Sequence, residues 1–222
     1  MIIAFILWLI KKTVTSVINK TSKKTMLLLL ILAFNYPIVF AQTKTLKYNI
    51  FHKDALIGKM VFNQNKNYDD LYLKMTSDVH VKFLFSLEVK TEEDAFFQDG
   101  ELNYSHNSRI INGKEKLKNQ TKAINNSYQI ISNGKTKTLN NSKIEYNILL
   151  LYYLEPIGIN SVYSDIFQQF LPINETNKHQ FKLKLPDGNC TYYYYKNGIC
   201  DKVEIQSSLY TIVMKLSEIK TL

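Results

Sequence analysis

The 222-residue sequence predicts a mainly β protein, in which an antiparallel meander forms a curved, half-open sheet or incomplete barrel with one α-helix packed on it. Two observations lead to this fold class. Apolar and polar residues alternate over long stretches, as in strands solvated on one side, and five of the seven glycines directly follow Asn or Asp, as in tight hairpin turns. With 45% hydrophobic residues the chain can build a core, which excludes a wholly disordered protein.

Residues 1–41 have the pattern of an export signal. Lys20, Lys23 and Lys24 precede an apolar run over 26–34, and Val39 and Ala41 stand at the two small-residue positions of a cleavage site. We therefore expect cleavage near Ala41, a single β-rich domain over 42–222, and a periplasmic or secreted protein. The alternative is an uncleaved N-terminal helix that anchors the protein, although the run is short for a hydrocarbon core of about 30 Å.

The strands of the remaining chain are delimited by turns and by changes in the apolar pattern. Apolar residues keep to odd positions from Leu71 to Val89, which is too long for one ordinary strand, so we expect two strands or one sharply bent strand with a corner between Asp78 and Ser86. After Ile205 the apolar parity changes, and a bulge at Ser207-Ser208 would explain this. The turn pairs are Asp99-Gly100, Asn112-Gly113, Asn133-Gly134, Asp187-Gly188 and Asn197-Gly198.

One helix is predicted between the strands. Ser142 and Glu145 have the spacing of a capping box, and the apolar run that follows reaches Leu154 before Pro156. We expect a helix over 143–154 that packs its apolar face onto the sheet. The segment 162–173 is interpreted as a loop that returns to a strand.

The run Tyr192–Tyr195 and the two cysteines lie near the Asn197-Gly198 turn. On a strand, two of the four tyrosines face the core and two are exposed, where they pack across strands or contact a ligand. With a two-residue turn, Tyr195 pairs with Cys200 and Cys190 lies opposite Ile205, about 16 Å along the strand from Cys200, whereas bridged Cα atoms lie within about 7 Å. Both thiols are therefore predicted to be free.

Five runs of the sequence resemble an uncharacterised family of short secreted proteins of Gram-negative bacteria, known only as a domain of unknown function. They are YNIFHKDALIGKM (48–60), VKFLFSLEVKTEEDAFFQDG (81–100), NGKTKTLNNSKIEYNILLLYYLEP (133–156), VYSDIFQQFLPI (162–173) and LPDGNCTYYYYKNGIC (185–200). That family is distantly similar to periplasmic proteins with a half-open curved sheet and to lipoprotein-carrier-like folds, which hold an acyl chain. The resemblance brings no catalytic residues.

A non-enzymatic protein that binds a lipid or another amphiphile in the curve of the sheet is the leading hypothesis, because long half-polar strands and one apolar helix leave a concavity with a lid. We expect a monomer without a cofactor. The residues expected to line the concavity are Phe83, Phe85, Leu149, Tyr152 and Tyr153.

The net charge of +9 is unevenly distributed. Residues 1–41 hold +5, the segment 109–143 holds +7, and the rest holds −3. The segment 109–143 predicts either a basic patch that docks a cell-envelope module onto an anionic envelope component or protein partner, or lysines that protect a hairpin edge from strand addition. A nucleic-acid partner is excluded because the chain holds a single arginine. The patch comprises Arg109, Lys114, Lys116, Lys118, Lys122, Lys135 and Lys137, with Lys143 at its end.

Catalytic and metal-binding motifs are not apparent in the sequence. The four histidines have no metal-ligand spacing, and the acidic run Glu92–Asp94 is interpreted as solvated surface. An unrecognised hydrolase is therefore the third hypothesis, and an open cleft with a perturbed carboxylate would favour it.

Overall fold

The computed structural model describes residues 42–82, 86–140 and 142–221, which all belong to the compact unit Ala41–Leu222. The predicted export signal and the predicted lining residues Phe83 and Phe85 lie outside the described residues. The elements are β1 (Gln42–His52), β2 (Ala55–Asn67), β3 (Asp70–Lys82), β4 (Ser86–Gln98), β5 (Glu101–Ile111), β6 (Lys114–Ile124), β7 (Ser127–Ser132), β8 (Lys135–Asn140), α3 (Leu150–Tyr153), β9 (Ser161–Ser164), β10 (Gln169–Asn177), β11 (Gln180–Lys184), β12 (Cys190–Lys196), β13 (Ile199–Gln206) and β14 (Thr211–Thr221).

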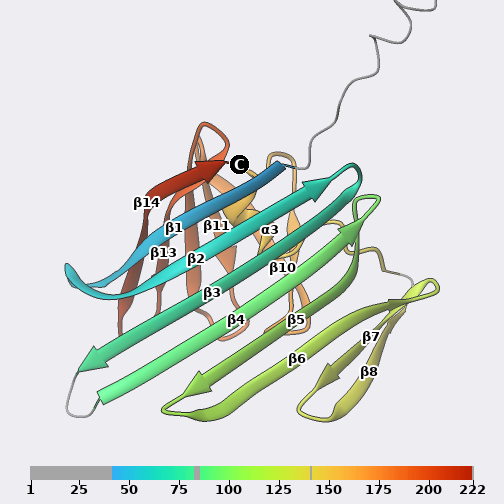
Figure 1. The fold of residues 1–222 in the computed structure, drawn as a ribbon, viewed down its shortest axis with the longest axis horizontal. Helices are drawn as coiled ribbons and strands as arrows, with labels where there is room; N and C mark the ends of the chain where they lie inside the picture. Colours follow the sequence, from blue (N-terminus) through green and yellow to red (C-terminus); the bar gives the residue numbers. More distant parts are fainter. Residues whose placement is uncertain (1–41, 83–85, 141, 222) are drawn as a thin grey trace, which may run out of the picture. The chain divides into compact units, whose positions relative to one another are not determined.

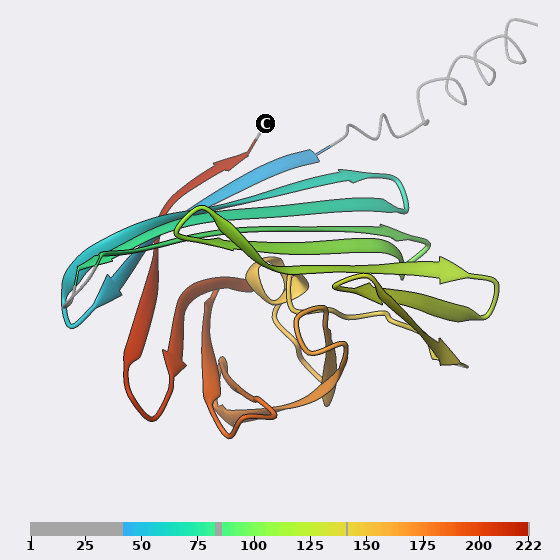
Figure 2. The same ribbon diagram turned by 90° about the horizontal axis from the view of Figure 1, so that it is seen from below.

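The strands of this unit form one 14-stranded sheet in the order β8-β7-β6-β5-β4-β3-β2-β1-β14-β13-β12-β11-β10-β9. Strands consecutive in the chain pair antiparallel, except β8 and β9, and β1 pairs with β14, so that the two runs of the meander join at this seam. Strands β1–β8 make a broad layer, and β9–β14 curl back beneath it (Figures 1 and 2). The sheet is not closed, because β8 and β9 are its edges. The predicted fold class is confirmed.

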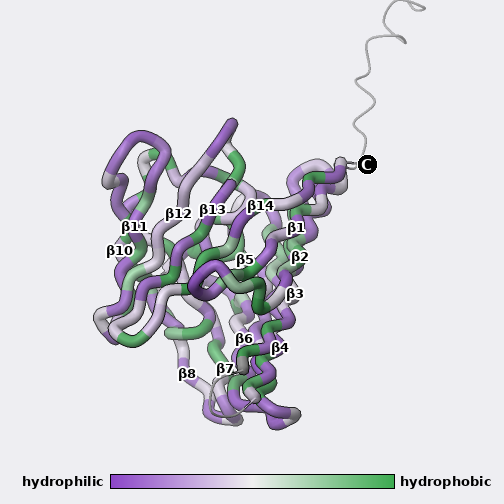
Figure 3. The backbone as a smooth tube through the Cα atoms, turned by 90° about the vertical axis from the view of Figure 1, so that its left-hand side faces the viewer, coloured by the Kyte–Doolittle hydropathy of each residue, from purple (hydrophilic) through white to green (hydrophobic). Residues whose placement is uncertain are grey.

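Alternating side chains explain why these segments form strands. Along β1 the residues Leu46, Tyr48 and Ile50 are buried and the residues between them are partly exposed. Hydrophobic and hydrophilic positions alternate along the strands in Figure 3. In β12 the predicted division of the tyrosines is confirmed, since Tyr193 and Tyr195 are buried and the other two are half-buried.

Four of the five predicted turns are tight hairpin turns with positive φ at both residues. In Asn112-Gly113 these angles are 48° and 73°, values that an L-residue with a larger side chain rarely adopts. The fifth, at Asp187-Gly188, has positive φ only at Gly188. The others with two positive angles are Asp99-Gly100, Asn133-Gly134 and Asn197-Gly198.

The long alternating stretch forms two strands, as predicted. β3 ends at Lys82 and β4 begins at Ser86, and these two residues pair with each other.

The predicted bulge at Ser207-Ser208 is wrong, because a hairpin turn stands there. The Ser207 amide donates to the Tyr210 carbonyl at 3.0 Å, and the Ser207 hydroxyl accepts from the Leu209 and Tyr210 amides, both at 3.2 Å. Gln206 pairs with Thr211, so four residues separate the strands. An even number of turn residues reverses the parity of the inward-facing positions, which explains the change in the sequence pattern.

The predicted helix over 143–154 is mostly extended chain, and only Leu150–Tyr153 is helical. The Ser142 hydroxyl donates to the Asn140 carbonyl instead of capping a helix. The Ile144 carbonyl accepts from the Leu102 amide and the Tyr146 carbonyl from the Tyr163 amide, each at 2.8 Å. Because neighbouring strands already form hydrogen bonds with the carbonyl groups of this segment, it does not need helical hydrogen bonds.

The segment 162–173 is predicted as a loop that returns to a strand, and it differs in beginning within a strand, β9, before the turn and β10. It forms most of a β9–β10 hairpin, in which Val162 pairs with Leu171. The apolar residues of this short run follow neither a helical nor a strand period, so the strand with which the run pairs decides its conformation.

The crossover 144–153 passes through the interior, between the broad layer and the curled strands (Figure 2). Tyr152 lies with its ring 5.8 Å from those of Tyr48 and Phe62 and 6.2 Å from that of Tyr193. The Tyr195 hydroxyl donates to the Leu151 carbonyl at 2.7 Å. These contacts fix the crossover in the core.

Cys190 and Cys200 are both free, as predicted. Tyr195 pairs with Cys200, but a register shift after Tyr194 places Cys190 opposite Gln206 and not opposite Ile205. Cys190 therefore still lies several residue pairs along the hairpin from Cys200, too far away for a disulfide.

The backbones of β2 and β3 lie unusually close together at Gly58. A Cβ atom at this position would lie 2.3 Å from the Asp78 carbonyl oxygen and 2.9 Å from the Val79 Cα, both rigid backbone atoms. We predict that Gly58→Ala lowers the free energy of unfolding by about 1–3 kcal/mol, as overpacking does. Denaturant unfolding followed by circular dichroism measures this.

Gly113→Asn is the matched control for Gly58→Ala. Gly113 has a φ of +73°, and a Cβ atom at this position would meet nothing within 4 Å. Asn tolerates a positive φ. The control should lose less than about 1 kcal/mol. Equal midpoints for the wild type and Gly58→Ala would contradict the close approach.

Candidate functional site

A partly open cavity of about 370 Å³ lies inside the curve of the sheet. The broad layer contributes residues from β1 to β5, the curled part contributes residues from β11 to β14, and Ile148 and Tyr152 come from the crossover. Its apolar lining residues include Ile50, Met60, Met75, Val79, Ile166, Phe167, Leu183, Leu185, Tyr193, Val203, Ile205, Ile212 and Met214. A cavity of this character suits an apolar ligand.

Polar side chains form one wall of this cavity. In register across the inner face, Thr91 of β4 pairs with Arg109 of β5, and two residues further in Glu93 pairs with Asn107. Thr91, Glu93 and Arg109 line the cavity. Met60 and Met75, on the neighbouring strands β2 and β3, continue the same rows with apolar side chains. Polar inner-face side chains are thus concentrated in the middle of β4–β6, while those of β1–β3 are mostly apolar, with Ser77 between Met60 and Thr91 as an exception.

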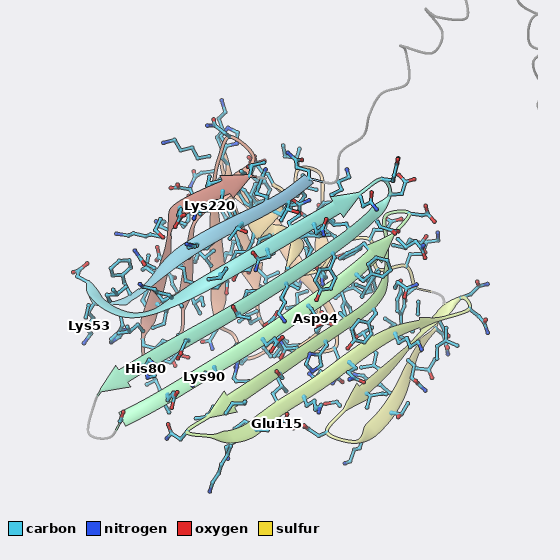
Figure 4. The ribbon with its side chains drawn as sticks, in the orientation of Figure 1. Lys53, His80, Lys90, Asp94, Glu115 and Lys220 are labelled. Atoms are coloured by element: carbon cyan, nitrogen blue, oxygen red, sulfur yellow. The ribbon has the colours of Figure 1, made fainter. Side chains whose placement is uncertain are left out.

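Glu93 is the most perturbed carboxylate of the cavity wall. It is 8% exposed, and its burial, together with the nearby Asp165 carboxylate, raises its pKa to about 7, while Arg109 opposes the rise. The sequence placed Glu93 in a solvated acidic run, which is wrong for this residue. Its neighbour Asp94 lies on the outer face, labelled in Figure 4, because successive side chains of a strand alternate.

A second buried carboxylate, Asp165, lies in the turn between β9 and β10 and contacts the inner face of β5 and β6. It accepts hydrogen bonds from the Ser105 hydroxyl at 2.5 Å and the Thr121 hydroxyl at 3.0 Å. The Asn119 amide donates to the Asp165 main-chain carbonyl at 2.8 Å. Burial raises its pKa to about 6, and the two hydroxyls limit the rise. This cluster ties the curled part of the sheet to the broad layer.

The structure places the predicted ligand-binding residues in different environments. Tyr152 lines the cavity. Leu149 is buried in the core, and the Tyr153 ring is half-buried with the Lys44 ammonium 5.4 Å from its centroid. Since no ligand contact is seen for any of them, a binding role for these residues stays a prediction.

The predicted basic segment does not form one surface. Lys118 and Lys122 pair with Ser108 and Tyr104, which places them on the outer face of β6, whereas Arg109 lines the cavity. Figure 4 shows the same outer face, with Glu115 labelled. Arg109 and these lysines therefore cannot bind one partner surface.

A bulge at Lys116 further divides the lysines of β6. Arg109 pairs with Leu117 but Ile110 pairs with Glu115, so the register shifts by one residue. Lys114 then pairs with Ile111 on the inner face, and it does not share the face of Lys118 as their spacing predicted.

The remaining basic residues of the segment lie elsewhere. Lys135 and Lys137 are on the edge strand β8, and the Lys137 ammonium donates to the Gln168 carbonyl at 3.4 Å. Lys143 forms a salt bridge with Glu101. Lysines on an edge strand agree with the alternative interpretation, in which they protect a hairpin edge from the addition of another strand.

One group of possible metal ligands occurs among the described residues. Asp78, His80 and Glu88 lie on the outer face with ligand atoms within 4.8 Å of one another. His80 is 2.9 Å from Asp78, and Glu88 is 2.6 Å from the Lys90 ammonium. All three are solvated and each already has a partner, so these contacts explain the group without a metal.

No helix of the described residues is both long enough and apolar enough to cross a membrane.

The fold and the cavity define a half-open, barrel-like antiparallel β protein with an interior site. The chain belongs to the family described as Domain of unknown function (DUF6134), whose model matches residues 48–217. Comparison with curated proteins gave no significant match. The fold is similar to a structure titled "Crystal Structure of Beta-barrel-like Protein of Domain of Unknown Function DUF1849 from Brucella abortus", with a TM-score of 0.52 and 10% identity over 83% of this chain and 98% of that chain.

Glu93 makes the stability of the fold depend on pH. Between its ordinary pKa of 4.5 and its folded pKa of about 7, the folded protein keeps a proton that the unfolded chain has lost. The free energy of unfolding should therefore fall as the pH rises from about 4.5 to about 7. Glu93→Gln should flatten this slope and stabilise the protein at pH 8 by up to about 3 kcal/mol, measured by denaturant unfolding.

The exposed Glu115→Gln variant provides the control, and it should keep the wild-type slope. An identical slope in both variants would show that Glu93 is not held protonated.

The Asp165 cluster should contribute strongly to stability. Asp165→Ala leaves the buried Ser105 and Thr121 hydroxyls without their acceptor and is expected to lower the free energy of unfolding by about 2–4 kcal/mol. Asp165→Asn retains an acceptor oxygen and should lose much less. Thermal unfolding of both variants at pH 7 measures the difference, and equal losses would contradict the role of the acceptor.

Proposed function

We propose that the protein is a non-enzymatic periplasmic protein that binds an apolar or amphiphilic ligand in the cavity inside its curved sheet. The single observation that carries the proposal is the lining, in which methionine, isoleucine, leucine and valine side chains from both parts of the sheet face one partly open space. Binding there removes apolar surface from water at about 25 cal/mol per Å².

The size of the cavity favours a small ligand. A volume of about 370 Å³ is at the lower end of the range of about 300–1,000 Å³ for ligand pockets. It suits one alkyl chain better than a lipid with several chains. The three methionines of the lining, Met60, Met75 and Met214, are flexible enough to adapt to such a chain.

The export pattern of residues 1–41 supports a periplasmic location, where amphiphiles must be carried through water. The resemblance to secreted Gram-negative proteins and to lipoprotein-carrier-like folds agrees with this role by analogy only. An uncleaved N-terminal anchor would leave the site on the same side of the membrane.

A cell-envelope docking module is a second candidate function, favoured by the exposed Lys118 and Lys122 on the outer face of β6. Changing both lysines to glutamate should then abolish co-purification of an anionic partner while ligand binding persists, because the cavity lies on the other face.

A hydrolase is the third candidate, favoured by Glu93, since a general acid needs a raised pKa in an accessible cleft. Histidine and cysteine are absent from the described lining of the cavity, so a catalytic partner would have to be a hydroxyl side chain or the Asp187 carboxylate. A bound ligand that is recovered chemically unchanged would contradict this candidate.

Native mass spectrometry of the protein purified from its own host tests the leading proposal. We expect a lipid-sized adduct on the wild type and its loss in Ile212→Trp, which places an indole in the cavity. Val213→Trp, at the adjacent outward-facing position of β14, is the matched control and should keep the adduct. A wild type that never has an adduct would contradict the proposal.

A further inference from the structure

In one row of the inner face, polar side chains of β4–β6 occupy positions that are apolar on β2 and β3. One row across the sheet runs Phe62, Met75, Glu93, Asn107 and Asn119, and the next row towards the cavity mouth holds Thr91 and Arg109. A sheet that only needed a core would place apolar residues at these positions, as the neighbouring strands do. The polar wall therefore calls for an explanation beyond packing.

Several polar atoms of this wall are buried without a hydrogen-bond partner. They include the Asn119 Oδ1 and the Arg109 Nε. Each such atom costs about 1–3 kcal/mol when it stays unpaired. The contrast with Asp165 is clear, because that carboxylate is paired with two hydroxyls in the same interior.

Arg109 and Glu93 both line the cavity, yet they do not form a salt bridge with each other among the ion pairs of the described residues. The Arg109 guanidinium, whose Nε has no hydrogen-bond partner, thus lines a largely apolar cavity without a paired carboxylate. A guanidinium binds a carboxylate with two parallel hydrogen bonds, which makes it selective for that planar anion.

We propose that Arg109 binds the carboxylate head of a single-chain fatty acid, that Glu93 donates a hydrogen bond to the same carboxylate, and that the alkyl tail lies among the methionines and isoleucines of the cavity. This inference rests on the proposed ligand-binding function and specifies its ligand. Asn107, paired in register with Glu93, is a positioning residue.

The charge balance favours a carboxylate over a phosphate. The groups that face Glu93 are Arg109 of β5, Asp165 of the β9–β10 turn, Tyr152 of α3 and Tyr193 of β12. Burial raises the pKa of both tyrosines, so they stay neutral. With Glu93 protonated, Arg109 attracts the single charge of a carboxylate, whereas a phosphate dianion would place a second negative charge beside Asp165 and be disfavoured.

The pKa of Glu93, about 7, sets the pH range of binding. Below this pH the protonated carboxyl donates to the ligand head. Above it the ionised carboxylate repels the head and competes for Arg109. Affinity for a fatty acid should therefore fall as the pH rises from 6 to 8, while affinity for an uncharged chain should not.

Isothermal titration calorimetry of the full mature protein with dodecanoate, dodecan-1-ol and dodecylamine tests the inference. The wild type should bind dodecanoate about tenfold or more tightly than dodecan-1-ol at pH 6, as one charge-assisted hydrogen bond allows. Arg109→Met should remove this preference and leave the affinity for dodecan-1-ol unchanged. Glu93→Gln should keep dodecanoate binding and lose the decrease between pH 6 and pH 8.

Two further variants are controls for indirect effects of the substitutions. Arg109→Lys keeps the charge but loses the two-pronged geometry, so it should bind dodecanoate with intermediate affinity and retain the fold. Lys118→Met, on the outer face, removes a charge away from the cavity and should bind like the wild type.

The possible outcomes separate the two proposals. Equal affinities for dodecanoate and dodecan-1-ol, a preference for dodecylamine, or an unchanged preference in Arg109→Met and Arg109→Lys would overturn the fatty-acid assignment while the cavity keeps its proposed function. Failure of all three probes to bind would overturn the proposed function itself, and the fatty-acid assignment with it.

Discussion

The anchoring of Asp165 to the inner face of β5 and β6 is the interaction on which the interior of this protein depends. Strand pairing joins the two parts of the sheet only at the β1–β14 seam, and the edges β8 and β9 do not pair, so other contacts must hold the curled part against the broad layer. The hydrogen bonds to Asp165 from Ser105 and Thr121, and that from Asn119 to its carbonyl, fix the β9–β10 turn against the broad layer. These hydrogen bonds hold the turn against β5 and β6 and so help to enclose the cavity between the two parts of the sheet.

The crossover 144–153 is the second constraint, and it sets how much of the interior stays open. Its extended part is held by the Leu102 and Tyr163 amides, and its short helix places Tyr152 between the rings of Tyr48, Phe62 and Tyr193. One end of the interior is thus filled with aromatic side chains. The space that remains faces Glu93 and Arg109, which is why the polar wall and the apolar lining meet at one site.

The polar side chains on the inner face of β4–β6 have consequences for both stability and binding. Burying Glu93 and Asp165 with raised pKa values destabilises the fold as the pH rises, and natural cores rarely accept this without a functional reason. The same groups give an otherwise apolar cavity a chemically distinct end. An amphiphile with a small anionic head would match both ends at once.

The sequence by itself determined the strands and most turns, because alternation and the Asn-Gly pairs are local signals that require only neighbouring residues. It even indicated that Glu93 faces away from Glu92 and Asp94, since side chains alternate, but it could not show that this face is buried. The extended form of 142–146, the inward Arg109 and the division of the lysines at the Lys116 bulge were decided only by the tertiary structure. They depend on which strand lies alongside, and a register shift of one residue moves every side chain beyond it to the other face.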